Sequence, residues 1–200
     1  GLYTGSAYTD LLITDPVSTK LVTAAVLATL GDAVSQGTEE GEPYDWARGL
    51  SFGAFGGLYT GCFQHWWFLA LSELVPYVPA DDLPMSFLSA AVKTTLCQFG
   101  TIPLIYLPIF FLITGFLRGL STEQSWERAS TLYWPVLQRN VTFWIPVQMV
   151  QFLLVDPEWQ VPYCCVAGLL WTVILSKLAG PLQVEPKGSQ QAESLLARTD

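Results

Sequence analysis

The stretch LVTAAVLATL, residues 21–30, decides the fold that this sequence predicts. It lies inside an apolar run from about residue 17 to about residue 35, and Pro16 precedes the run, where the first turn of a helix tolerates proline. A helix needs about 20 mostly apolar residues to cross a bilayer. We therefore predict a membrane-spanning helix over this run.

Four further apolar runs follow along the chain, at about residues 46–75, 85–117, 136–155 and 161–178. The run at 85–117 exceeds one span, and Pro103 and Pro108 interrupt it, so we expect a kinked helix or two short helices there. The five runs together predict an all-α polytopic membrane helix bundle with four to five hydrophobic helices, one of them kinked by proline.

Polar segments separate these runs. The segment RGLSTEQSWER, residues 118–128, is expected to be an exposed connection in which Ser121 begins a Ser-x-x-Gln pattern that resembles a helix capping box. Residues 183–200 are polar and contain Pro186 and Gly188, which predicts a flexible tail. We expect a single transmembrane helical domain over residues 1–182, followed by this tail.

The composition excludes several classes of protein. Of the 200 residues, 51% are hydrophobic and 13% are charged, about half the charged fraction of an ordinary soluble domain. The net charge is −8, and the nine Lys and Arg residues are scattered along the chain. Because no basic surface could neutralise a run of phosphates, we exclude nucleic acid as a partner.

The reactive side chains form no recognisable catalytic or metal-binding motif. Cys62, Cys97, Cys164 and Cys165 each lie in an apolar stretch without the paired spacing of a zinc or redox site, so we expect packed, reduced thiols and no metal. Nucleotide-binding glycine loops, hydrolase elbows and metalloprotease helices are also missing from the sequence. We therefore expect a protein that is not an enzyme.

Four glycines, Gly49, Gly53, Gly57 and Gly61, repeat at four-residue spacing. Residues at this spacing lie on one face of a helix. Small residues there let a second backbone approach closely, which is how helices associate in lipid. The stripe predicts helix packing, either within the bundle or at the seam of an oligomer.

Polar side chains inside the apolar runs need an explanation because they are costly in lipid. Asp32 could pair with Lys93 or Arg139 and line a watery path, whereas Lys20 lies about 18 Å from Asp32 along one helix and needs another partner. The alternative is that these groups snorkel toward the headgroups or tie helices together. The candidates are Lys20, Asp32, His65, Lys93, Gln98, Arg139, Gln148 and Gln151.

His65 is the single histidine and has Gln64, Trp66 and Trp67 as neighbours. One imidazole without a second His, Cys or carboxylate nearby does not make a metal site of the usual kind. It could serve as an axial ligand to a porphyrin or chlorophyll, which needs only one nitrogen. The other interpretation is a hydrogen bond between helices beside an interfacial tryptophan belt.

Several motifs, in order over residues 8–178, resemble the 22-kDa peroxisomal membrane protein family and its mitochondrial inner-membrane, Mpv-type relatives. The motifs cover all five runs, and together they are specific although each is weak. The matching residues are Tyr8, Pro16, Thr19, Lys20, Thr23, Gly31, Asp32, Gln36, Asp45, Arg48, Gly61, His65, Trp67, Phe68, Lys93, Gln98, Pro103, Tyr133, Pro135, Asn140, Trp144, Gln148, Phe152, Val155, Trp171 and Ser176.

The chain departs from the family pattern at several polar positions. Cys97 stands where the family has aspartate, Gln151 where it has asparagine, and Gln160 where it usually has arginine, while Cys62 replaces a proline. These departures weaken any polar pathway that the family shares.

The resemblance implies a pore-like integral membrane protein that passes small solutes passively across an organellar membrane, without ATP and without a required cofactor. Asp32, Lys93 and Arg139 would then line or gate the path. The resemblance leaves open whether the membrane is the mitochondrial inner membrane, the peroxisomal membrane or a plastid membrane. Membrane lipid is the expected partner.

A structural subunit of a larger respiratory or photosynthetic membrane complex is the alternative. Eight Trp, eight Tyr and eleven Phe residues are available to pack against lipid or a flat pigment. The chain also begins at Gly1 rather than Met, as an organellar protein without its transit peptide would. In this reading the chain binds lipid, chlorophyll or carotenoid, with His65 as the candidate pigment ligand, and its partner is a second copy or a larger complex.

Overall fold

The computed structural model describes residues 7–39, 43–75, 78 and 82–179, and the tail predicted at 183–200 lies outside this part of the chain. All regular elements in the described ranges are helical, which confirms the all-α prediction. The elements are α1 (Ala7–Thr14), α2 (Pro16–Gln36), α3 (Trp46–Gly56), η1 (Gly57–Phe63), α4 (Gln64–Leu74), α5 (Leu83–Thr95), η2 (Leu96–Tyr106), α6 (Leu107–Leu117), α7 (Thr122–Leu154), η3 (Pro157–Trp159) and α8 (Gln160–Ala179).

Two of the predicted runs are continuous helices that contain stretches of π-helix. Elements α3, η1 and α4 follow one another without a break over 46–74, and α5, η2 and α6 do so over 83–117. Pro103 lies inside η2, where a wider turn accommodates a residue that lacks a backbone N–H. The alternative of two separate short helices at 85–117 is therefore wrong.

Polar residues of the connections begin several helices. Asp15, Asp45 and Asp82 are the N-caps of α2, α3 and α5, and each carboxylate accepts a hydrogen bond from a backbone N–H of the first turn. Ser121 caps α7 in a reciprocal capping box with Gln124, as predicted. Because α7 begins at Thr122, most of the segment 118–128 is helix rather than the expected exposed connection.

Three helices are long and apolar enough to cross a membrane: Pro16–Gln36, Leu83–Leu117 and Pro157–Ala179. The predicted number of four to five is therefore higher than the number that meets this criterion. The other two predicted runs also form long helices, over 46–74 and Thr122–Leu154, but they carry more polar side chains, such as Arg48, Gln64 and Arg128.

Helix α2 has two unlike faces. Val22, Val26, Leu30 and Val34 repeat every four residues and are exposed, whereas the residues that pack inside the bundle are small or polar. This arrangement is the reverse of a helix in a water-soluble protein, whose apolar stripe faces the core. It is typical of a helix that presents aliphatic side chains to lipid.

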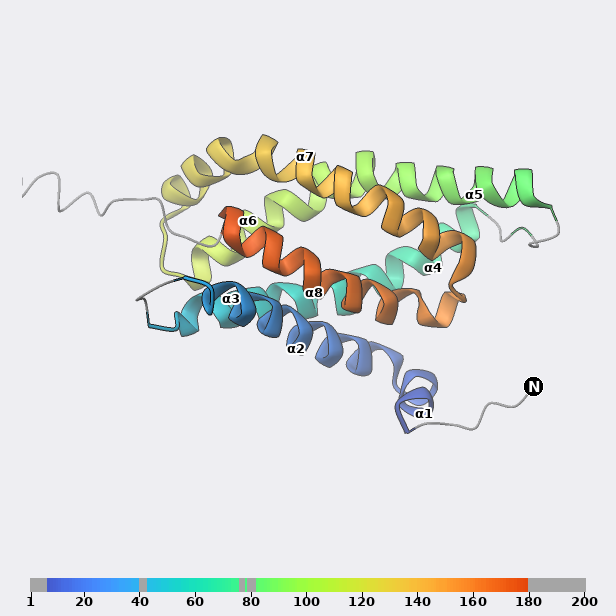
Figure 1. The fold of residues 1–200 in the computed structure, drawn as a ribbon, viewed down its shortest axis with the longest axis horizontal. Helices are drawn as coiled ribbons and strands as arrows, with labels where there is room; N and C mark the ends of the chain where they lie inside the picture. Colours follow the sequence, from blue (N-terminus) through green and yellow to red (C-terminus); the bar gives the residue numbers. More distant parts are fainter. Residues whose placement is uncertain (1–6, 40–42, 76–77, 79–81, 180–200) are drawn as a thin grey trace, which may run out of the picture.

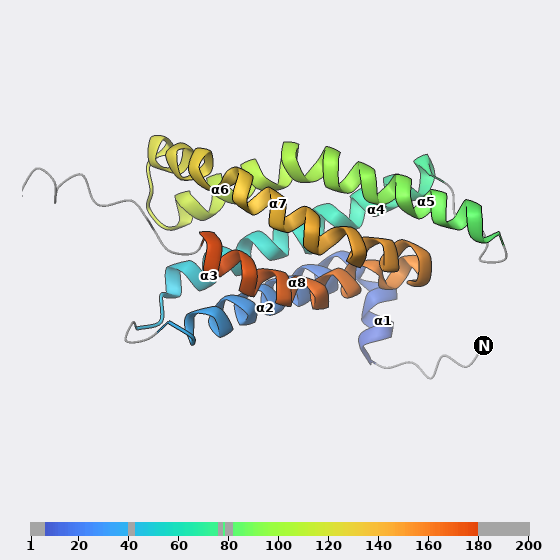
Figure 2. The same cartoon turned by 45° about the horizontal axis from the view of Figure 1, so that its top comes forward.

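The long helices lie side by side in one bundle (Figure 1). Helix α2 packs against α3, η1 and α8, and α7 packs against α5, α6 and α8. The short helix α1 stands across the start of α2 at one end of the bundle, where α4 and α5 also lie (Figure 2). The bundle therefore has a distinct α1 end, and the last turn of α2 and the first turn of α3 lie at the other end.

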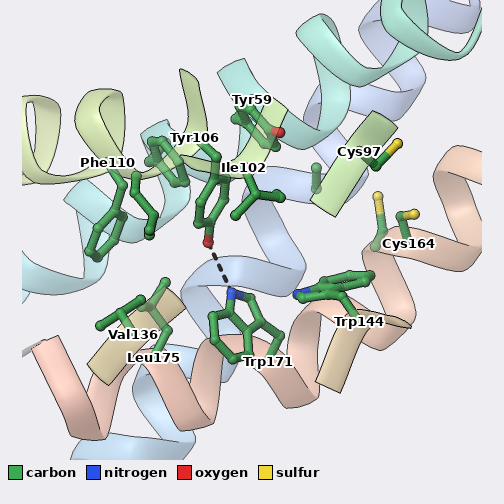
Figure 3. Close-up of a cluster of buried hydrophobic side chains, with 14 of the residues drawn as sticks. Tyr59, Cys97, Ile102, Tyr106, Phe110, Val136, Trp144, Cys164, Trp171 and Leu175 are labelled. Carbon is green, nitrogen blue, oxygen red and sulfur yellow. Dashed lines mark hydrogen bonds between the residues drawn. The ribbon is translucent and has the colours of Figure 1, made fainter. Parts of the chain in front are cut away.

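An aromatic cluster fills the centre of the bundle (Figure 3). Tyr106 packs edge-on against Phe55 and Tyr59, with ring centroids 5.1 and 4.7 Å away. The Trp171 Nε1–H donates a hydrogen bond of 2.9 Å to the Tyr106 hydroxyl, which joins α8 to η2. The bond pairs the indole N–H of Trp171 with the Tyr106 oxygen inside the bundle, as buried Trp and Tyr side chains usually require.

Candidate functional site

One face of α2 carries the residues from which the candidate site is built. Lys20, Ala24, Ala28 and Asp32 repeat every four residues and are 6%, 3%, 9% and 0% exposed. They form a line of about 18 Å along the inner side of the helix. This line passes three places that differ in shape and chemistry: a pocket, a small cavity and an ion-pair cluster.

The first place is a pocket of about 370 Å³ at the α1 end of the bundle, which we call the entrance pocket. Lys20, His65, Lys93 and Gln160 are among the polar residues that line its inner wall. The Lys20 ammonium donates a hydrogen bond of 3.0 Å to His65 Nδ1, and the Lys93 ammonium lies 6.0 Å from the centre of the Phe152 ring. The pocket therefore presents two buried cations.

The second place is a cavity of about 50 Å³ in the middle of the bundle, called here the middle cavity. Gln64, Asn140, Gln148 and Gly168 are among its lining residues. Gln98 donates a hydrogen bond of 2.8 Å to Gln148. The Gln64 Oε1 and both side-chain polar atoms of Asn140 are buried without a hydrogen-bond partner among the described residues. The cavity is large enough for water, and its lining supplies unpaired donors and acceptors.

The third place is a buried ion-pair cluster centred on Arg48, called the Arg48 cluster. Arg48 Nε lies 3.0 Å from Asp32 Oδ1, and the two terminal nitrogens hold the Glu39 carboxylate at 2.8 and 3.0 Å. Arg48 also donates a hydrogen bond of 2.6 Å to the Ser176 hydroxyl, which in turn contacts Asp32. Gln36 donates to the other Asp32 oxygen at 2.7 Å. Fully satisfied charges of this kind hold α2, α3 and α8 together.

Two more arginines lie on the Arg48 side of the bundle. Arg118 donates a hydrogen bond of 3.0 Å to the N-cap carboxylate of Asp45. Burial lowers the pKa of Arg118, and the Asp45 carboxylate acts in the opposite direction. Arg128 donates to Thr114 at 3.1 Å and to the Ala179 carbonyl, at the last residue of α8. These arginines fasten the ends of α3, α6 and α8.

The expected partners of Asp32 were wrong. Asp32 pairs with Arg48. Lys93, on α5, lines the entrance pocket together with Lys20, and Arg139 is exposed on α7. Arg48 was missed as a site residue because it lies only three positions after the acidic connection, at the edge of the apolar run, where a charged side chain is not unusual. Its occurrence three residues after the N-cap Asp45, in the first turn of a glycine-rich helix, was the available signal.

The stripe glycines make room for other parts of the chain. A Cβ on Gly57 would lie 3.3 Å from Ala25 Cβ, and a Cβ on Gly61 would lie 2.6 Å from the Leu21 backbone nitrogen. Gly53 faces Thr29 of α2, and Gly49 faces Tyr44 of the preceding connection. Three of the four glycines thus lie against α2.

The hydrogen bond between Lys20 and His65 affects whether His65 could bind the metal of a pigment. A neutral imidazole that accepts a hydrogen bond at Nδ1 carries its proton on Nε2. With Lys20 donating to Nδ1, neither ring nitrogen then offers a free lone pair to a metal at the centre of a pigment. The contact instead ties α2 to α4.

Known proteins resemble this chain over most of its length. The sequence model of the Mpv17 / PMP22 family matches residues 115–176. Peroxisomal membrane protein 2 of Bos taurus is 26% identical over 180 residues, covering 86% of this chain and 88% of that protein. The mitochondrial inner membrane protein Mpv17 of Homo sapiens is 26% identical over 173 residues, covering 85% and 94%. PXMP2/4 family protein 4 of Dictyostelium discoideum is 27% identical over 177 residues, covering 86% and 91%.

No solved structure matches the chain. The resemblance inferred from the motifs is confirmed, and so is the expected localisation in an organellar membrane that the chain crosses several times. The relatives are proteins of the peroxisomal membrane and of the mitochondrial inner membrane.

Proposed function

We propose that this chain, a relative of the Mpv17 / PMP22 family, is a passive pore for small solutes that is closed at one end. The observation that carries the proposal is the inner face of α2. Its residues Lys20, Ala24, Ala28 and Asp32 lead from the entrance pocket, past the middle cavity, to the Arg48 cluster.

Two other parts of the bundle repeat this order. Along the helix at 46–74, His65 lines the entrance pocket, Tyr59 lines the middle cavity and Arg48 forms the cluster. Along α8, Val161 and Gly168 line the pocket and the cavity, and Ser176 belongs to the cluster. Because three neighbouring helices keep one order, the three places follow one another along the bundle.

The chemistry of the middle cavity supports a path for polar molecules. Unpaired buried amides are costly, and proteins normally satisfy them with a partner or with water. Gln64 and Asn140 offer such groups beside a cavity of about 50 Å³. Water or a small solute that forms hydrogen bonds would satisfy these amide groups. The proposed path therefore explains why polar side chains are present at positions where an apolar side chain would cost less to bury.

The Arg48 cluster is the proposed gate. Asp32 and Arg48 are 0% and 3% exposed, and their hydrogen bonds join three helices across the end of the path. With these hydrogen bonds formed, the proposed path is closed at this end. Opening requires the Arg48 guanidinium to break some of its hydrogen bonds to Asp32, Glu39 and Ser176. No chemical step and no energy source is needed for such a pore.

The proposal is tested by reconstituting the chain into liposomes and measuring the flux of small polar solutes. We expect flux above that of empty vesicles. Gly168 lines the middle cavity, and a Cβ added there would have no heavy atom within 4 Å, so Gly168→Leu fills the path without a backbone clash. Gly100 is equally open but does not line this cavity, which makes Gly100→Leu the matched control.

The expected result is that Gly168→Leu removes most of the flux while Gly100→Leu leaves it unchanged. Wild-type flux equal to that of empty vesicles, at several voltages and pH values, would overturn the pore. Equal flux through Gly168→Leu and the wild type would show that solute does not pass through the middle cavity.

A further inference from the structure

The entrance pocket combines two buried ammonium groups with apolar walls. Lys20 and Lys93 are 6% and 8% exposed. Leu12, Phe68 and Leu71, all buried, line the same pocket. Its volume of about 370 Å³ falls in the range of cavities that hold small ligands. The pocket therefore has the size and mixed chemistry of a ligand site.

Lys93 is the first evidence for the charge of the ligand. Its ammonium makes no hydrogen bond and no ion pair with any residue in the described ranges, and it faces the Phe152 ring at 6.0 Å. A buried charge without a partner is costly. An anion in the pocket would supply the missing partner.

Lys20 is the second piece of evidence for the charge of the ligand. It contacts His65 Nδ1 at 3.0 Å, and this neutral group provides Lys20 with a hydrogen bond but not with an ion pair. Asp156 and Glu158 also line the pocket, but they are exposed and form no ion pair with either lysine among the described residues. Glu158 acts on the charge of Lys20 only from beyond ion-pair distance. Solvent and salt screen such an exposed carboxylate, so the buried inner wall keeps two ammonium groups without an anionic contact in the described part of the chain.

We infer that the entrance pocket binds a small organic anion, whose carboxylate or phosphate group is held by Lys20 and Lys93 and whose apolar part lies against Phe68 and Leu12. The inference rests on the proposed pore function and names the class of solute that the pore admits. The same anionic group also occurs on the headgroups of acidic lipids, and the experiment below separates these two sources.

The test measures binding rather than transport. Wild-type protein is placed in nanodiscs of zwitterionic lipid, and binding of fluorobenzoate and of its neutral isostere fluorobenzamide is followed by fluorine NMR. We expect fluorobenzoate to bind at least about tenfold more tightly than the amide, the factor that corresponds to one charge-assisted hydrogen bond. Equal binding of the two probes would overturn the inference.

Substitutions of the lysines locate the site. Lys93→Met keeps the length of the side chain and removes the charge, so fluorobenzoate binding should weaken by about tenfold. Lys93→Arg keeps the charge and should retain binding. Lys177, exposed on α8 outside the pocket, provides the control variant Lys177→Met, which should bind as the wild type does. Unchanged binding in Lys93→Met would overturn the inference, and thermal unfolding of each variant shows that it is folded.

Nanodiscs that contain acidic lipid distinguish the sources of the anion. If acidic lipid weakens fluorobenzoate binding to the wild type, a headgroup competes for the pocket, and if it has no effect, the pocket takes the soluble anion. Both results retain the anion site. Because binding is measured without flux, a closed or absent pore leaves this test intact, and a failed binding test leaves the flux measurement standing.

Discussion

Arg48 and Asp32 form a buried ion pair between α3 and α2, with Nε 3.0 Å from Oδ1. The other polar atoms of the two side chains are also hydrogen-bonded: Glu39 and Ser176 accept from Arg48, and Gln36 donates to Asp32. The pair lies where the inner face of α2 ends at the Arg48 cluster. It therefore determines both the packing of three helices and the closure of the proposed path.

Removing one member of this pair should destabilise the fold. Arg48→Gln leaves Asp32 buried without its cation, and the loss of one partner of a buried pair costs about 3–5 kcal/mol. Unfolding in detergent, followed by circular dichroism against denaturant, measures this loss. Arg139→Gln makes the same change at an exposed position and should stay within about 0.5 kcal/mol of the wild type.

The double variant Asp32→Asn with Arg48→Gln measures the interaction energy between the two side chains, apart from their interactions with other residues. Since it removes both charges, it should be less destabilised than the sum of the two single variants. Strictly additive losses would contradict a direct interaction between the two side chains.

Glu39 should regulate opening more than it stabilises the fold. Its side chain is 35% exposed, yet both carboxylate oxygens hold the Arg48 guanidinium. Glu39→Gln weakens this hold without leaving a fully buried charge, so the open fraction of the pore should rise. Single-channel recording in planar bilayers measures it. Glu123→Gln, at an exposed position in the first turn of α7, should have no effect; an equal rise in both variants would refute the role of Glu39.

Gly61 should tolerate no side chain. A Cβ there would lie 2.6 Å from the Leu21 nitrogen and 2.7 Å from the Lys20 carbonyl oxygen, both of them backbone atoms. Gly61→Ala therefore forces α2 away from η1 and should cost about 1–3 kcal/mol, as overpacking usually does. Thermal unfolding in detergent gives the change. Gly100→Ala, where a Cβ meets nothing within 4 Å, should not lower the stability.

The sequence was sufficient to predict the helices because their signals are local. The apolar length of the run around Ala24 and Ala25, the proline at its start and the capping box at Ser121 each act within a few residues. These signals gave the all-α bundle. Hydropathy alone overestimated the number of clear spans, since the helices that contain the predicted runs at 46–75 and 136–155 carry buried polar side chains and do not meet the criterion for a membrane span.

The partners of the polar side chains were beyond local reasoning because they depend on how each helix is rotated. Arg139 and Asn140 are neighbours on α7, yet Arg139 is exposed and Asn140 is 0% exposed. One step along a helix turns the side chain by about 100°, and an evenly apolar run does not reveal that angle. For the same reason, the sequence offered Arg139 as a partner of Asp32 when the partner was Arg48.

Asn140 gives the sharpest test of whether the middle cavity is a path or a structural defect. Both of its side-chain polar atoms are buried without a partner among the described residues, beside the cavity. Asn140→Leu removes these atoms and fills space, so the free energy of unfolding should rise by about 1 kcal/mol or more. Solute flux through liposomes should fall, because the polar lining is lost and the path is narrower.

The exposed neighbour Gln138 supplies the control, since Gln138→Leu also replaces an amide by leucine on α7 but outside the cavity. It should leave the flux unchanged. If Asn140→Leu instead lowers stability and leaves the flux as it was, the amide ties the bundle together and does not line the path. A protein that gains stability as it loses flux is expected only where a polar group is retained for function, because a purely structural interior would favour leucine at this position.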